Sequence, residues 1–230
     1  ISIDKSNSLF VWNIQTGQLV QKIMGIHDDV TQIVKSEDDN FLFIGTILGY
    51  ILVYDMKSYE LIKGNFIKLE DSITTLNYDN NNQDLVIGTK AGDVFFYHIY
   101  EGLEHLAELL KNREYVKVYE YLDFNPLLKY TEPYKIFDQI WEKTLSKAKD
   151  FLSISKGDKA LALFDNFQGI PAKRTLINKL MKDYVEYDKF ILYIEQNKLP
   201  LAYGLADKYP VYKESSYYKI IELQWKKDFI

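Results

Sequence analysis

The first 100 residues contain a pattern that repeats every 42 to 43 positions. Its copies start at Asn7, Gly49 and Gly92, and each start is followed by a short, mainly apolar run. A second motif has the same spacing, because residues 43–46 and 86–89 share the tripeptide Ile-Gly-Thr. Short apolar runs separated by polar turns are typical of antiparallel strands, so each copy predicts three short strands. Asn and Gly tolerate positive φ angles, which places the start of each copy in a tight turn.

The end of each run carries a family resemblance. Val11-Trp12-Asn13 and Val53-Tyr54-Asp55 stand where the WD-repeat family of β-propellers has its Trp-Asp signature. The spacing also matches the period of that family, roughly 40–45 residues, and its blades have four strands. The sequence therefore resembles WD-repeat propellers. The resemblance implies that residues 1–101 form the C-terminal blades of an incomplete propeller.

The sequence departs from the family pattern at several positions. Tyr97-His98 replaces Trp-Asp in the third copy, and Ile26 precedes His27 where the family has glycine. Leu48 and Ala91 replace the aspartate that is usual in the second turn of each copy. The hydrogen-bonded tetrad of the family is thus mostly absent. The repeat predicts a fold and carries almost no information about a ligand.

A helical pattern begins at Gly102, where the third copy should continue into a fourth strand. A three-stranded sheet leaves an unpaired edge, which natural sheets avoid. The resemblance implies that a strand from residues upstream of Ile1 fills this edge, and that roughly four or five further blades precede it. We therefore expect that residues 1–100 do not close a propeller by themselves.

Residues 102–230 change to the three-and-four spacing of amphipathic helices. Apolar stripes predict two long helices, and shorter helical segments alternate with them. The long helices are expected over residues 131–153 and 172–195, and the short ones over residues 114–123, 158–167 and 199–208.

A constant offset of 84 positions relates the two ends of this helical region. Pro126 matches Pro210 and Trp141 matches Trp225 at this offset, and Pro171 falls between them. We infer a unit of about 42 residues, made of a short helix, a proline-marked turn and a long helix. This period is that of an α-solenoid, similar to tetratricopeptide arrays but longer than their unit of roughly 34 residues.

The two predicted domains are β-propeller blades over 1–101 and an α-solenoid over 102–230, and they differ in charge. Residues 1–100 carry 7 Lys and 13 Asp or Glu, whereas residues 101–230 carry 21 Lys or Arg and 20 Asp or Glu. Neither part has the basic excess that nucleic-acid binding usually requires. The most apolar segment, residues 41–54, is too short for a spanning helix, so no membrane insertion is expected.

Residues suited to catalysis or metal binding do not cluster in the sequence. His27, His98 and His105 have no second histidine and no cysteine at i+2, i+3 or i+4, the spacings that a helix or strand would use to hold a metal. Residues 79–84 resemble a calcium loop only superficially, because Lys90 stands where the bidentate glutamate is needed. The chain has no cysteine, which excludes disulfides, thiolate metal sites and cysteine nucleophiles. We therefore expect no catalytic site, no metal and no cofactor.

Tyrosine is abundant, at 19 of 230 residues. Tyr130, Tyr193 and Tyr212 fall off the helical stripes, and tyrosine is enriched in interface hot spots. These three residues are the candidates for an exposed protein-contact surface. The aromatic residues on the stripes are interpreted as core, and they are Tyr134, Trp141, Tyr184, Tyr218 and Trp225.

Two repeat architectures without a catalytic cluster favour a non-enzymatic scaffold whose partners are other proteins. No small-molecule substrate is expected. Two alternatives stay open. One is a propeller enzyme or small-molecule binder whose site lies on upstream blades, and the other is an assembly factor for an exported or membrane complex. A cytoplasmic location is expected, with a periplasmic one left open.

Overall fold

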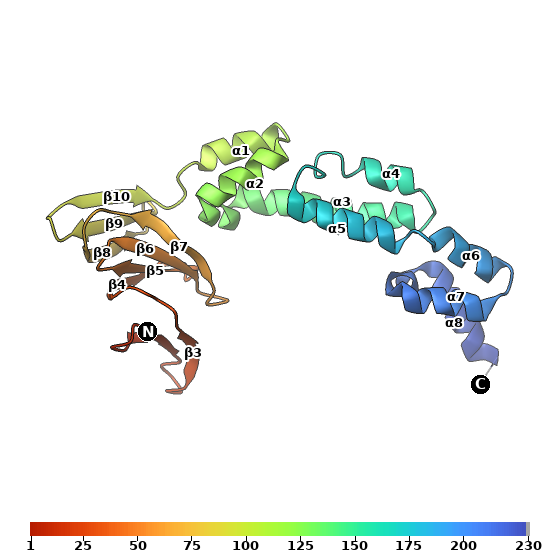
Figure 1. Cartoon of the computed structure of the whole chain (residues 1–230), viewed down its shortest axis with the longest axis horizontal. Helices are drawn as coiled ribbons and strands as arrows, with labels where there is room; N and C mark the ends of the chain where they lie inside the picture. Colours follow the sequence, from red (N-terminus) through yellow and green to blue (C-terminus); the bar gives the residue numbers. More distant parts are fainter. Residues whose placement is uncertain (229–230) are drawn as a thin grey trace. The chain divides into compact units, whose positions relative to one another are not determined.

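The computed structural model describes residues 1–228, with side chains described as far as Leu223. It contains β-sheets followed by helices, in the order expected from the sequence (Figure 1). Contacts divide the chain into two compact units. The β unit comprises Ile1–His105 and Tyr121–Thr131, and the helical unit comprises Leu106–Glu120 and the residues from Glu132 onward.

Three antiparallel sheets make up the β unit. Sheet A contains β1 (Ser2–Ile3), β2 (Leu9–Trp12) and β3 (Leu19–Ile23). Sheet B contains β4 (Val30–Lys35), β5 (Phe41–Thr46), β6 (Tyr50–Asp55) and β7 (Leu61–Lys68). Sheet C contains β8 (Ile73–Asp79), β9 (Asp84–Thr89) and β10 (Val94–His98). No strand follows β10 within residues 1–228, so the predicted change from strands to helices near Gly102 is confirmed.

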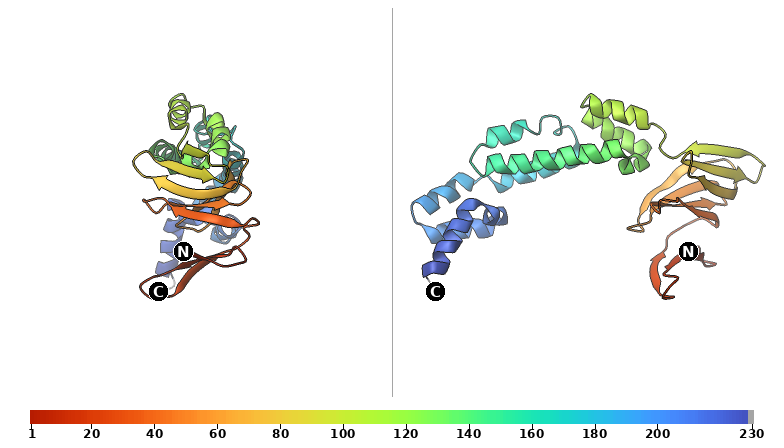
Figure 2. Two further views of the ribbon diagram at one scale, coloured as in Figure 1. Left: turned by 90° about the vertical axis from the view of Figure 1, so that its left-hand side faces the viewer. Right: turned by 180° about the vertical axis from the view of Figure 1, so that it is seen from behind.

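Sheet B is buried on both faces, which explains the continuous apolar sequence of β5. Successive side chains point to opposite faces of a sheet. Leu42 and Ile44 therefore pack with Leu9 of sheet A, whereas Phe41 and Phe43 pack with residues of sheet C. All six residues of β5 are buried. Both views in Figure 2 show sheet B between the other two sheets.

The turn that precedes β2, β6 and β10 recurs in all three sheets. Asn7, Gly49 and Gly92 occupy it with φ angles of 56°, 83° and 97°. The sequence predicted this turn because Asn and Gly adopt such angles at the least cost. The three repeat copies are therefore copies of one local backbone structure.

A second turn follows β2, β6 and β10, and it determines where the sheets differ. Gly17, Tyr59 and Gly102 occupy it with φ angles of 69°, 59° and 86°. After Gly17 and Tyr59 the chain enters the outer strands β3 and β7, whereas after Gly102 it enters α1 (Leu103–Lys111). Sheet C thus keeps the turn but has no fourth strand, as the sequence predicted.

A later segment, Tyr121–Thr131, returns to the β unit. Leu127 is fully buried in the core that sheets B and C share. The Asn125 side chain donates hydrogen bonds to the carbonyl oxygens of Ile99 and Glu101 at 3.0 and 3.1 Å. The core of the β unit is therefore completed by residues that follow the first helices in the sequence.

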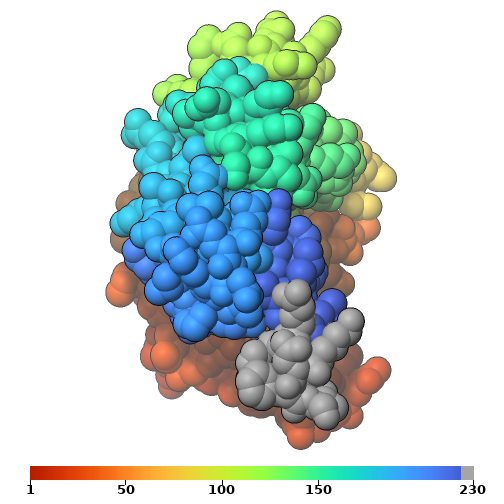
Figure 3. Space-filling view, turned by 90° about the vertical axis from the view of Figure 1, so that its right-hand side faces the viewer, coloured from red at the N-terminus to blue at the C-terminus, as the bar shows by residue number. Residues whose placement is uncertain are grey.

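The helices occupy the remaining chain in the order expected. After α1 come α2 (Tyr115–Phe124), the 3₁₀ helix η1 (Pro126–Tyr130), α3 (Glu132–Leu152), α4 (Gly157–Ala162) and α5 (Pro171–Asp183). They are followed by α6 (Tyr187–Glu195), α7 (Leu199–Lys208), the 3₁₀ helix η2 (Pro210–Glu214) and α8 (Ser216–Asp228). The helices predicted over 114–123, 131–153 and 199–208 are confirmed to within one residue at each end. The predicted core position of Trp225 lies outside the described side chains. Figure 3 shows the surface of the helical unit, with residues changing from green to blue in sequence order.

One backbone turn recurs at a regular interval in the helical unit. Arg113, Ser155 and Asn197 lie 42 positions apart and have φ angles of 59°, 61° and 56°. Each left-handed residue lies two or three positions after the end of a helix, and the next helix begins two positions later. The following residue closes all three turns by donating its N–H to the carbonyl five positions earlier, as in a Schellman motif. The unit inferred from the proline spacing is therefore present in the backbone.

The prediction of one helix over residues 172–195 is wrong. The chain bends at residues 184–186 and forms α5 and α6 in its place. Ile177 of α5 packs in one apolar cluster, whereas Tyr187 of α6 packs in another. The three-and-four spacing runs through both helices, so it gave no sign of the bend. The short helix predicted over 158–167 also ends early, because α4 stops at Ala162.

Candidate interaction surfaces

The three predicted contact tyrosines have different environments. Tyr212 is fully buried and its ring lies 5.0 and 5.1 Å from the rings of Tyr187 and Phe190. The expectation of an exposed ring at Tyr212 is therefore wrong. Tyr193 is half-buried, with the Lys189 Nζ atom 5.7 Å from its ring centre. Tyr130 belongs to the β unit, whereas Tyr193 and Tyr212 belong to the helical unit.

Tyr130 joins η1 to sheet B. Its hydroxyl donates a hydrogen bond of 2.5 Å to Asp55 Oδ2, and its ring meets Phe41 edge-on with centres 4.7 Å apart. Asp55 Oδ1 also accepts hydrogen bonds from the backbone N–H groups of Lys57 and Ser58. Burial opposes ionisation of Asp55, but the hydrogen bonds outweigh it and lower its pKa below the usual value. Burial, followed by the bond to Asp55, raises the pKa of Tyr130. Tyr130 is thus part of an internal contact between η1 and sheet B.

Lys63 adds a second contact between sheet B and the segment next to η1. Its Nζ donates hydrogen bonds to the carbonyl oxygens of Asp123 and Phe124 at 2.9 and 2.7 Å. These are the last two residues of α2, where carbonyl groups lack helical partners and a cation is stabilising. Sequence reasoning missed this contact, because Lys63 lies in β7 and its partners are 60 and 61 positions away.

One face of sheet C is uncovered in the part of the chain that the structure describes. The side chains of Val94 and Phe96 are 60% and 72% exposed, and Val86, which pairs with Phe96, is only half-buried. Strand β10 pairs with β9 on one side and is one of the two edge strands of the sheet. Exposed apolar side chains beside an unpaired edge are the features through which a sheet recruits another strand or surface.

The histidines have separate partners. His98 Nδ1 lies 3.0 Å from Asp84 Oδ1 across the β9–β10 pair. The His105 ring packs edge-on against Tyr121, with centres 4.9 Å apart. His27 lines a mainly apolar pocket of about 310 Å³ beside sheet B. Within the described residues, no group of three or more His, Cys, Asp or Glu side chains is placed to hold a metal ion.

A groove of about 290 Å³ lies between α1 and α3 in the helical unit. Tyr115 and Phe137 pack beneath it, with ring centres 4.8 Å apart. Ile136 and Ile140 on one wall remain 49% and 42% exposed. Its full lining is Ala107, Leu110, Lys111, Tyr115, Pro133, Ile136, Phe137 and Ile140. The apolar spacing in the sequence of α3 did not predict the groove, because a groove depends on the size of the residues that face α3 from α1.

Comparisons with known proteins give local similarity. No family model matches the chain. U3 small nucleolar RNA-associated protein 21 from Saccharomyces cerevisiae is 28% identical over 99 residues, which cover 42% of this chain. The match spans only 10% of the length of that curated relative. Among solved structures, the computationally designed Ika4 protein matches 39% of this chain and 52% of its own, with 27% identity and a TM-score of 0.33.

None of the helices that the structure describes combines the length and apolar character needed to cross a membrane.

Proposed function

We propose that this chain is a non-enzymatic scaffold that binds other proteins through two repeat arrays. In this proposal the β unit is part of a WD-repeat propeller, and the helical unit is an α-solenoid. The observation that carries the proposal is that each unit has its own recurring turn: one returns every 42 or 43 positions at Asn7, Gly49 and Gly92, and another returns every 42 positions at Arg113, Ser155 and Asn197. Stacked repeats build broad, rigid surfaces. Such surfaces suit protein partners, whose interfaces typically bury roughly 1,200–2,000 Å².

The similarity to U3 small nucleolar RNA-associated protein 21 supports a place in an assembly with other macromolecules. Direct contact with RNA is disfavoured for the β unit. Residues 1–100 carry a net charge of −6 from 7 Lys and 13 Asp or Glu, and nucleic-acid binding depends on neutralising phosphates with cations. We therefore propose protein partners in preference to nucleic acid.

Chemical cross-linking of the whole chain in a cell extract, followed by mass spectrometry, tests the proposal. We expect defined partner proteins cross-linked to lysines of this chain, with the same partners recovered from a His27→Ala variant. Truncation of the chain before Gly102 would not isolate the β unit for a control experiment. It would remove Leu127 and Asn125, which belong to the β unit. The whole chain is therefore the appropriate material. The scaffold proposal fails if no partner protein is recovered, or if the chain turns over a small molecule and His27→Ala abolishes that turnover.

A further inference from the structure

We propose that the groove between α1 and α3 binds a bulky apolar side chain from an acidic segment of a partner protein. This inference rests on the proposed scaffold function and assigns one contact site to it. The groove is lined mainly by apolar side chains, and its wall residues Ile136 and Ile140 are about half exposed. Every lining residue belongs to the helical unit.

An internal copy of the same structure shows what the groove lacks. The elements α1, α2, η1 and α3 correspond, at a constant offset of 84 positions, to α6, α7, η2 and α8 respectively. At this offset, Ala107 of the groove corresponds to Ile191, and Pro133 corresponds to Tyr217. Ile191 and Tyr217 pack against the apolar core of the second copy. The first copy therefore has two small residues where the second copy fills the space with its own side chains.

The volume of the groove sets the size of the occupant. An apolar cavity of roughly 150 Å³ binds benzene, so a groove of 290 Å³ accommodates an aromatic ring together with an aliphatic neighbour. Aromatic anchors that fill such pockets contribute much of the binding energy at protein interfaces. The occupant is thus one apolar anchor and its flanking residues.

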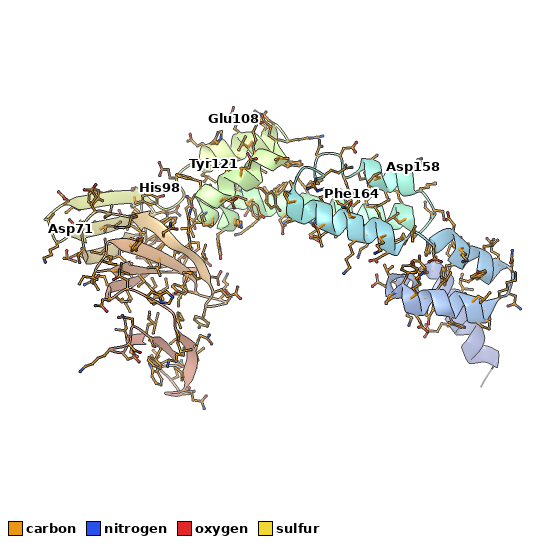
Figure 4. The ribbon with its side chains drawn as sticks, in the orientation of Figure 1. Asp71, His98, Glu108, Tyr121, Asp158 and Phe164 are labelled. Atoms are coloured by element: carbon orange, nitrogen blue, oxygen red, sulfur yellow. The ribbon has the colours of Figure 1, made fainter. Side chains whose placement is uncertain are left out.

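The charges around the groove determine which residues of the partner segment are favoured beside its apolar anchor. Lys111 lines the groove, and Lys143 and Lys147 follow Ile140 on the same face of α3. All three lysines are exposed, and within the described residues none of them forms an ion pair or a side-chain hydrogen bond. Of the two glutamates of α1, Glu104 lies in its first turn, and Glu108 is on its outer surface (Figure 4). Carboxylates beside the apolar anchor would therefore meet unpaired cations.

The test uses the whole chain and a display library of random peptides. Peptides are selected on the wild-type protein and then measured against Ala107→Ile, which introduces the residue of the second copy and fills the groove. The matched control is Ala172→Ile, the same change at an exposed position of α5. We expect enriched peptides to share a large apolar residue with neighbouring Asp or Glu. They should bind Ala107→Ile at least about tenfold more weakly than wild type or Ala172→Ile.

A second variant keeps the test decisive if Ala107→Ile lowers stability. Lys143→Glu leaves the lining intact, and it should weaken the same peptides and favour peptides with Lys or Arg beside the anchor. The inference is overturned if binding of the enriched peptides is unaffected by both variants. It is also overturned if Ala107→Ile abolishes self-association of the chain, because the occupant is then a second copy. If cross-linked partners persist unchanged in Ala107→Ile, the groove assignment fails while the scaffold proposal stands.

Discussion

Tyr130 and Asp55 lie 75 positions apart in the chain, and a hydrogen bond of 2.5 Å joins the Tyr130 hydroxyl to Asp55 Oδ2. The bond attaches η1 to the end of β6 in sheet B. Together with Asn125 and Lys63, it holds a segment that follows two helices against the sheets. The β unit is therefore more than the strand-forming part of the sequence.

We expect Tyr130→Phe to destabilise the β unit. The variant keeps the ring against Phe41 but leaves a partly buried carboxylate short of one donor, at a cost of about 1–3 kcal/mol. Chemical denaturation monitored by fluorescence measures the change. Tyr78→Phe is the matched control, because Tyr78 packs in the same core and its hydroxyl makes no hydrogen bond within the described residues. Equal losses in the two variants would contradict the role of the hydroxyl.

The pH dependence of stability should contain a contribution from Asp55. Its pKa is lowered in the folded state from the ordinary value of 3.8. A lowered carboxyl pKa stabilises the fold at pH values above the ordinary value, and this contribution is lost as the pH falls through the folded-state pKa. The melting temperature of Asp55→Asn should therefore differ most from wild type near neutral pH, and the two curves should converge in acid. Parallel curves from neutral to acidic pH would rule this contribution out.

Gly49 and Gly92 occupy the same turn in sheets B and C, but the two positions should differ in how well they tolerate substitution by alanine. Both have positive φ, so alanine strains either turn by about 1–2 kcal/mol. A Cβ atom on Gly49 would also lie 2.4 Å from the Leu69 carbonyl oxygen and 2.5 Å from that of Asp71, whereas Gly92 has nothing within 4 Å. Because backbone cannot move aside cheaply, Gly49→Ala should lower the melting temperature several times more than Gly92→Ala. Similar shifts for the two variants would contradict the close approach.

The sequence predicted these turns because residue type alone limits which positions tolerate positive φ. The prediction from sequence was wrong where packing determines a change in helix type or in helix direction. The offset of 84 pairs Tyr212 with Leu128, and both are fully buried in the two 3₁₀ helices. That pairing was the signal that Tyr212 belongs to the core. The bend at residues 184–186 had no such signal, because Val185 is exposed and the apolar spacing continues across it.

Thr131 and Ser215, which match at the offset of 84, should each stabilise one of the two copies of the helical repeat. Each hydroxyl is buried and donates to the carbonyl three positions earlier, at 2.6 Å in both cases. Replacing either with alanine should cost about 0.5–1.5 kcal/mol, since the buried turn loses one hydrogen bond while the carbonyl keeps the backbone N–H of the substituted residue as a partner. Thr144→Ala is the control, because its hydroxyl bonds a helix carbonyl at the surface and alanine favours helix. Urea denaturation should show a loss for the first two variants and none for the third.

The uncovered face of sheet C should make the chain associate with itself. Phe96 is 72% exposed beside the unpaired strand β10, and exposed apolar edges pair with one another unless a charge blocks them. Phe96→Lys places a cation on this face without touching the buried side of the sheet, so it should lower the average mass measured by light scattering at a given concentration. Val185→Lys makes the same change of charge at a site that is 68% exposed in the helical unit, and it should leave association unchanged. If the wild-type chain stays monomeric over the whole concentration range, or if both lysine variants act alike, the face of sheet C is not the surface through which it associates.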